Sequence, residues 1–144
     1  MGWTNTITLG EYTINAAFRG AFGHSLVNTF RAFYEPRVGS QKSYNYINTE
    51  LANNEITNAN FSYLYVEKAD FFKLDNLTIS RPTRDNINLS LNVRNAFVIT
   101  DYTGSDPEPA LFDLLDGNPL APGIDRRNSY YSARSFTLGL NIKF

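Results

Sequence analysis

Few side chains in this sequence have a type and spacing that could do chemistry. His24 is the only histidine among the 144 residues, and there is no cysteine. A zinc site would therefore need carboxylate ligands from elsewhere. We interpret His24 as a loop residue and expect no metal bound to it.

Acidic residues gather in the last third of the chain, where carboxylate oxygens could suit calcium. They are Asp101, Asp106, Glu108, Asp113, Asp116 and Asp125. Their spacing lacks the regularity of a calcium-binding loop, and nothing places two carboxylates at the defined separation that a glycosidase needs. We therefore expect solvated loop charges, no cofactor and no enzymatic activity, with loop-bound calcium as the alternative.

Loop aromatic residues are a second kind of candidate, because exposed rings stack on sugars or anchor a partner. Five tyrosines fall between the regular segments described below: Tyr34, Tyr44, Tyr46, Tyr130 and Tyr131. Packing of loop against loop explains them about equally well, and we lean towards it. They are carried forward as candidates for contact with a substrate or a partner.

Bulk composition limits the class of protein. The formal net charge is −1 with no basic run, which argues against a nucleic-acid surface. Charged residues make up 19% of the chain, below the roughly 25% of soluble domains. No stretch approaches ~18 consecutive apolar residues, so a transmembrane helix is excluded. Barrel strands are still compatible with the composition, because they alternate lipid-facing and lumen-facing residues.

Five segments alternate apolar and polar residues with a period of two, which predicts β-strands. They span residues 3–9, 12–22, 71–80, 87–94 and 136–144. In the third segment the apolar parity changes, so we expect a bulge near Asp75 and Asn76. The polar positions of the strands hold our candidates for a lumen-facing surface: Arg19, Asn88, Asn92, Arg94 and Asn141.

The connections between these segments are alternately short and long. Residues 10–11 and 81–86 are short turns, whereas residues 23–70 and 95–133 are long. Transmembrane barrels show this asymmetry, with short periplasmic turns and long extracellular loops. A compact soluble sandwich rarely carries two structureless connections above ~15 residues. Within the first long connection, we expect a short helix over residues 25–34 and an extended stretch over 61–67 that prolongs the third strand.

The final segment, FTLGLNIKF, is the strongest single motif. Its apolar residues recur at every second position: Phe136, Leu138, Leu140, Ile142 and Phe144. A barrel needs such a strand because an unpaired edge in hydrocarbon is costly, so the last strand must pair with the first. The motif resembles the signal that the outer-membrane assembly machinery recognises in a terminal strand.

Four stretches resemble one family, the SusC/RagA-type TonB-dependent transporters, in its C-terminal region. They are FRGAFGHSLVNTFRAFYE (18–35), YVEKADFFKLDNLTIS (65–80), INLSLNVRNAFVITDYTGSDPE (87–108) and GIDRRNSYYSARSFTLGLNIKF (123–144). Together they cover nearly the whole chain. The block around residues 95–108 and the Gly123-Ile124-Asp125 block are the most specific parts.

This resemblance implies an all-β fold of antiparallel strands forming the last part of a barrel of about 22 strands. Residues 1–144 would then be a C-terminal fragment, with the plug domain and the remaining strands absent. The whole protein would be an outer-membrane nutrient importer for glycans or peptides, with a periplasmic C-terminus. Its partners would be its own barrel and plug, a SusD-like surface lipoprotein, TonB (through the absent N-terminal part) and membrane lipid. Arg19 and Arg94 would then face the plug rather than the substrate.

Two other interpretations remain at this point. A smaller outer-membrane barrel without TonB would use the same strand pattern. A soluble, secreted β-sandwich, such as a carbohydrate-binding module, would bury the apolar face of each strand against a second sheet.

Overall fold

The computed structural model describes residues 1–35, 62–84, 86–108, 123–126 and 131–142. The chain forms two compact units. The sheet unit comprises Met1–Phe22, Asp70–Thr100 and Ser132–Phe144. The loop unit comprises Gly23–Ala69 and Asp101–Tyr131, the residues that connect the strands of the sheet unit.

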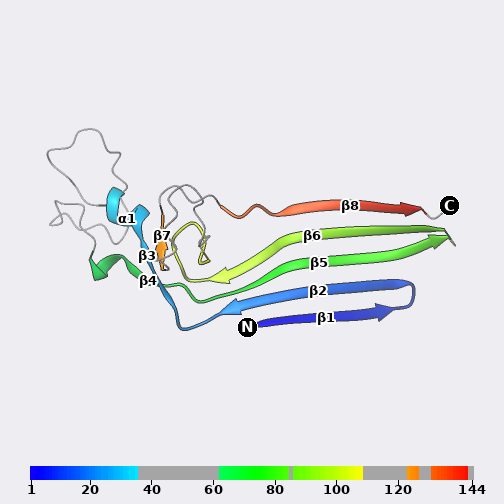
Figure 1. The fold of residues 1–144 in the computed structure, drawn as a ribbon, viewed down its shortest axis with the longest axis horizontal. Helices are drawn as coiled ribbons and strands as arrows, with labels where there is room; N and C mark the ends of the chain where they lie inside the picture. Colours follow the sequence, from blue (N-terminus) through cyan, green and yellow to red (C-terminus); the bar gives the residue numbers. More distant parts are fainter. Residues whose placement is uncertain (36–61, 85, 109–122, 127–130, 143–144) are drawn as a thin grey trace. The chain divides into compact units, whose positions relative to one another are not determined.

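The sheet unit is one antiparallel sheet whose strands lie side by side in chain order (Figure 1). Its strands are β1 (Gly2–Leu9), β2 (Tyr12–Ala21), β5 (Phe71–Arg84), β6 (Ile87–Thr100) and β8 (Ser135–Ile142). Each of the five alternating segments is therefore a strand, as predicted. The sheet order β1-β2-β5-β6-β8 is an up-and-down meander, the topology from which barrels are built.

The pairing register keeps the two kinds of side chain on separate faces. One apolar row crosses all five strands through residues that pair directly: Ile7, Ile14, Ile79, Leu91 and Leu138. The adjacent row on the other face is polar: Thr6, Asn15, Thr78, Asn92 and Thr137. A slip of one residue in any pair would move that strand's apolar set to the polar face, so the pattern specifies the register.

Much of the apolar face of the sheet is exposed, although Leu74 and Val93 are buried. Leu138 is 74% exposed, Phe136 68% and Trp3 57%. In a β-sandwich these residues would lie between two sheets and be buried. Within the described residues of the sheet unit there is only this one sheet, and the exposure of these side chains does not fit the core of a sandwich.

Short and long connections emerge at opposite ends of the sheet, as expected. The β1–β2 turn is Gly10-Glu11, and Gly10 has a φ of +59°, which glycine adopts without strain. The β5–β6 turn is shorter than the predicted residues 81–86, because β5 continues to Arg84 and β6 begins at Ile87. Pro82 is accommodated near the end of β5, where the register shifts between Pro82 and Arg84.

The bulge predicted near Asp75 and Asn76 is present. On the β2 side, Phe18 pairs with Leu74 and Ala17 with Asn76, which leaves Asp75 as an extra residue. On the β6 side, Leu74 pairs with Phe97 and Asn76 with Arg94. Asn95, opposite the bulge, has a φ of +51°, a left-handed conformation that asparagine tolerates better than most residues.

The loop unit contains a small second sheet in the order β4-β3-β7. Its elements are β3 (Ser25–Asn28), α1 (Thr29–Tyr34), η1 (Tyr63–Tyr65), β4 (Val66–Lys68) and β7 (Ile124–Asp125). Strand β3 pairs antiparallel with β4 and parallel with β7. Leu26, Ala69 and Tyr102 form its buried apolar cluster.

Two expectations for this region were wrong in detail. The helix expected over residues 25–34 begins only at Thr29, because residues 25–28 are drawn into a strand and Asn28 caps the helix by accepting a hydrogen bond from the Arg31 backbone nitrogen (3.1 Å). The stretch expected to prolong a strand of the main sheet instead becomes η1 and β4, which pairs with β3. None of the helices in the described residues is long and apolar enough to cross a membrane.

Candidate functional site

A hollow of about 760 Å³ opens on the polar face of the sheet unit. All of its lining residues carry polar side chains: Arg19, Asp75, Asn76, Asn92, Arg94, Asn95 and Ser135. They come from β2, β5, β6 and β8. The hollow lies where the bulge interrupts regular pairing, since Asp75, Asn76 and Asn95 all belong to the register shift.

Asp75 is engaged by two neighbouring cations. The guanidinium of Arg19 donates to a carboxylate oxygen of Asp75 at 2.8 Å. The ammonium of Lys73 lies 3.4 Å from the other oxygen. Asp75 shares the polar face with Lys73 by ordinary alternation, and Lys73 is the residue that pairs with Arg19. The single carboxylate of the hollow is therefore already paired.

The amides of the hollow are fixed by bonds across the sheet. Asn92 Nδ2 donates to Asn76 Oδ1 at 2.6 Å and to Thr78 Oγ1 at 2.7 Å. Asn95 Nδ2 donates to the carbonyl of Ala133 at 3.0 Å. These bonds hold the hollow in a defined shape.

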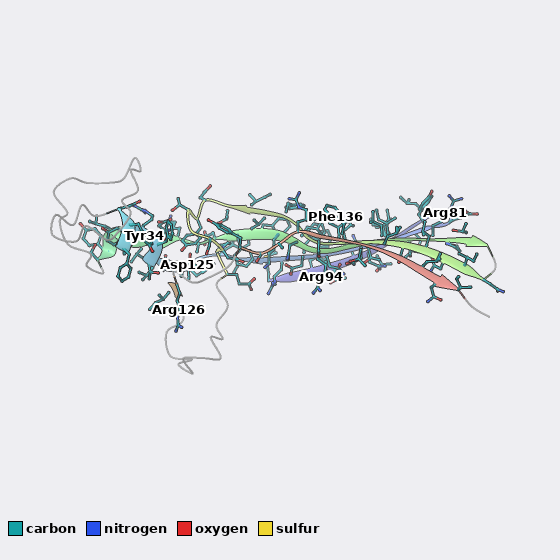
Figure 2. The ribbon with its side chains drawn as sticks, turned by 90° about the horizontal axis from the view of Figure 1, so that it is seen from above. Tyr34, Arg81, Arg94, Asp125, Arg126 and Phe136 are labelled. Carbon is teal, nitrogen blue, oxygen red and sulfur yellow. The ribbon has the colours of Figure 1, made fainter. Side chains whose placement is uncertain are left out.

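Arg94 differs from its neighbours. Its side chain is exposed and lines the hollow, and it makes no hydrogen bond or ion pair within the part of the chain that the structure describes. Figure 2 labels Arg94 and Phe136 on opposite sides of the sheet, as their registered pairing with Ser135 and Val93 requires. A guanidinium offers five hydrogen-bond donors, so Arg94 can bind a ligand in the hollow without breaking an internal bond.

The predicted lumen-facing residues all lie on the polar face, but they do not form one site. Arg19, Asn92 and Arg94 line the hollow together. Asn88 and Asn141 pair directly with one another elsewhere on β6 and β8. That this face borders a barrel lumen remains a prediction.

The apolar residues of the terminal motif follow the predicted alternation as far as the structure describes them. Phe136, Leu138, Leu140 and Ile142 pair with Val93, Leu91, Leu89 and Ile87 of β6. Phe144 lies outside the described residues. The role of this motif in barrel assembly also remains a prediction.

A partly buried polar cluster organises the loop unit around Glu67. Arg31 donates to Glu67 at 2.6 Å and forms a two-bond ion pair with Glu35 at 2.7 and 3.1 Å. Thr103 donates to Glu67 from both its hydroxyl (2.7 Å) and its backbone nitrogen (3.1 Å), and Asn28 adds a fourth donor at 3.2 Å. Burial alone would raise the pKa of Glu67, but the hydrogen bonds from Arg31 and Thr103 outweigh it and lower that pKa.

A second cluster surrounds Asp125, which is 3% exposed. Tyr102 donates its hydroxyl proton to Asp125 at 2.7 Å, and Ser105 donates from its hydroxyl at 3.2 Å. Burial, followed by the hydrogen bond to Asp125, raises the pKa of Tyr102. The expectation of a solvated charge was wrong for Asp125, because these donors replace water around its carboxylate.

The other candidates of the long connections are only partly described. Tyr34 is half-buried and packs on Phe30 with ring centroids 4.8 Å apart, whereas Tyr131 is 80% exposed. Tyr44, Tyr46 and Tyr130 lie outside the described residues, as do Asp113 and Asp116. His24 Nε2 lies 3.2 Å from the Pro107 carbonyl. Within the described residues, no cluster of three or more His, Cys, Asp or Glu side chains is arranged to hold a metal ion.

Sequence reasoning missed the clusters around Glu67 and Asp125. Asn28 and Thr103, which both bond to Glu67, lie 75 residues apart, and the members follow no periodic pattern. One available signal was Gly104 in the Asp101–Pro107 stretch: a Cβ there would come within 2.4 Å of the Tyr102 ring, so the tight fold of this stretch requires glycine. A glycine beside an aromatic and an acidic residue in a loop can mark such packing.

Comparison with known proteins supports the resemblance stated above. No family model matches the chain. The TonB-dependent receptor P3 of Formosa agariphila is 24% identical over 165 aligned residues, covering all of this chain and 16% of that receptor. The chain therefore spans about one sixth of the length of this relative.

Solved structures of the RagAB peptide importer share the fold. The closed-closed state matches with a TM-score of 0.66 and 19% identity, covering 93% of this chain and 16% of that one. The open-open state matches with a TM-score of 0.65 and 16% identity over 99% of this chain. The fold is thus that of a barrel-wall fragment, and the match to the Formosa receptor is in line with the resemblance to TonB-dependent transporters. These relatives are a receptor and an importer, which fits the non-enzymatic expectation.

Proposed function

We propose that this chain is the C-terminal wall segment of a SusC/RagA-type, TonB-dependent importer of the bacterial outer membrane. The observation that carries the proposal is the two-faced meander: an apolar row, exposed at Ile7, Leu91 and Leu138, and a polar row each cross all five strands. In a barrel, the apolar face contacts lipid and the polar face borders the lumen. The similarity to the Formosa receptor and the RagAB fold add the family context.

The role of the segment within the importer is structural. It supplies five strands of the wall, and its last strand, β8, leaves one edge to be paired by the first strand of a complete barrel. The short turns would face the periplasm together with the C-terminus. The long connections, which here fold as the loop unit, would then be extracellular.

The cargo of the whole protein is a large nutrient, glycan or peptide, and import draws energy through TonB, which would contact a part of the polypeptide outside this chain. A SusD-like lipoprotein would cover the extracellular mouth. The hydrogen-bonded clusters around Glu67 and Asp125 support this arrangement indirectly, because they give the loops a fixed fold of their own, as a docking surface needs.

The test is the intact mass of the polypeptide that carries this sequence, measured from detergent-solubilised outer membranes. We expect a mass several times the 16.3 kDa of this chain, together with a co-purifying lipoprotein. Deleting the gene in its host should abolish growth on one nutrient class, which would separate glycan from peptide. A 16.3 kDa protein in the soluble fraction would contradict the proposal.

A further inference from the structure

We propose that the hollow at the bulge binds a carboxylate group, with Arg94 as its ion-pairing residue. This inference deepens the importer assignment and rests on it, since it places the hollow in the wall of the lumen. The ligand is defined by its chemistry: a carboxylate on a small polar body, such as an acidic sugar or an acidic amino-acid side chain.

The side chains that line the hollow do not balance one another in charge. The lining of the hollow holds two cations, Arg19 and Arg94, and one anion, Asp75. Asp75 is paired with Arg19 at 2.8 Å and is also approached by Lys73 at 3.4 Å. No carboxylate of the described residues pairs with Arg94, so the hollow carries an unbalanced positive charge. A charge lining a partly enclosed polar hollow attracts the opposite charge more strongly than one on an open surface.

The geometry of the Arg94 guanidinium and its polar neighbours suits a carboxylate. A guanidinium binds a carboxylate through two parallel N–H···O bonds, and the planar fork of Arg94 is not used for any internal bond. The amides of Asn76, Asn92 and Asn95 and the hydroxyl of Ser135 surround it and can hydrogen-bond the rest of the ligand. The bonds that fix Asn92 and Asn95 exist before any ligand arrives, so less ordering is needed on binding.

The volume of the hollow, and the bulge that shapes it, also suit a small ligand. A volume of about 760 Å³ falls within the range of small-molecule sites and would accept one sugar or amino-acid unit. The bulge makes this room: Asn95 is held at a φ of +51° beside the extra residue Asp75. Bulges often re-aim side chains next to functional sites.

The carboxylate could come from two sources, the cargo or another segment of the same full-length polypeptide, and the experiment separates them. The full-length transporter, purified in detergent, is titrated with D-galacturonate, with N-acetyl-aspartate and with neutral D-galactose, and binding is followed by saturation-transfer NMR. The same preparation is melted without any added acid. The variants are R94Q and R94K, with K68Q as a control that removes one exposed positive charge from β4 in the loop unit.

If the cargo supplies the carboxylate, wild type and K68Q bind an acidic probe but not galactose, and R94Q weakens that binding at least tenfold while R94K retains part of it. If the same polypeptide supplies it, no probe binds wild type, and R94Q alone lowers the first melting transition. The proposal is overturned if R94Q binds the acids as wild type does, or if neither binding nor melting distinguishes R94Q from K68Q. Failure of the importer assignment would appear separately, in the mass and growth experiments.

Discussion

Leu91 and Asn92 are neighbours in the chain, yet they belong to two different rows that each cross all five strands. Leu91 pairs with Ile79 and Leu138, and Asn92 pairs with Thr78 and Thr137. Leu91 is 39% exposed on the apolar face. Asn92 instead donates two hydrogen bonds to β5. Of these two rows, one consists of aliphatic side chains and the other of hydroxyl and amide side chains, as a wall between lipid and an aqueous lumen requires.

Arginine substitutions on the two faces should have unequal effects. Arginine at Leu91 should cost ~2–4 kcal/mol in folding into lipid, because its registered neighbours Ile79 and Leu138 are apolar and the charge would enter hydrocarbon. Arginine at the adjacent Ser90 should be tolerated, because its partner Gly139 has no side chain to obstruct it. The measurement is the folding free energy of the full-length protein in phospholipid vesicles. Equal losses at both positions would contradict the assignment of faces.

The Tyr102–Asp125 hydrogen bond should stabilise the loop unit locally. Tyr102→Phe removes the hydroxyl and leaves the buried Asp125 carboxylate short of one donor, which should cost about 1–3 kcal/mol. Hydrogen exchange of the full-length protein should then show faster exchange in residues 101–108 and 123–126. The matched control is Tyr63→Phe, since Tyr63 is 83% exposed. Equal exchange in the two variants would mean that the buried bond contributes nothing.

Gly104 should be needed for the same contact. A methyl group at this position would meet the Tyr102 ring at 2.4 Å, so the ring or the backbone must move. Gly104→Ala should therefore reproduce the faster exchange of Tyr102→Phe, whereas the double variant should be little worse than either single one. Fully additive losses would show that Gly104 acts elsewhere.

Acid should loosen the loop unit through Glu67. Its pKa is lowered in the folded state from an ordinary value of 4.5. The stabilisation is therefore fully present above that value and is lost as the pH falls through the lowered folded pKa. Protection factors around Thr103 should be constant from pH 7 to 5.5 and should fall below about pH 4.5. Glu67→Gln should be less protected at pH 7 and should lose most of this dependence; an unchanged acid profile in that variant would exclude Glu67 as the titrating group.

The backbone conformation of Asn95 should affect the stability of the protein more than its side chain does. Its φ of +51° costs most L-residues roughly 1–2 kcal/mol, and glycine nothing. Asn95→Ala should therefore be less stable than Asn95→Gly by about 1 kcal/mol in urea titrations of the full-length protein in vesicles. Both variants lose the bond to the Ala133 carbonyl, so the difference between them isolates the backbone. Equal stability would mean that the bulge relaxes.

The sheet was predictable from sequence because its signal is local. Alternation along residues 87–94 fixes which side chains share a face, and the change of parity near Asp75 marks the bulge before any partner is known. The strand ends were less predictable: β6 continues to Thr100 past Asn95, where the alternation is interrupted. The alternation of neighbouring residues does not indicate where a strand continues after a bulge.

The loop unit was not predictable in the same way. Its clusters join Arg31 to Glu67 and Tyr102 to Asp125 across 36 and 23 residues, with no period to reveal them. The Ser25–Asn28 segment shows how long-range pairing competes with local preference. It was expected to be helical, but it pairs with β4 and β7 as a strand. The hollow combines the two cases: Arg19, Asn92 and Arg94 were found from parity, whereas Asp75, Asn76, Asn95 and Ser135 joined them only through the bulge and the register.

The central claim is that the apolar face of this sheet contacts lipid. The most direct measurement places a single cysteine with an environment-sensitive fluorophore at each position from Leu89 to Asn92 in the full-length protein, folded into vesicles. A lipid-borne quencher should act on positions 89 and 91, and a water-soluble quencher on positions 90 and 92. That strict alternation is the predicted result. Quenching of all four positions by the water-soluble agent, with none by the lipid-borne one, would contradict the account.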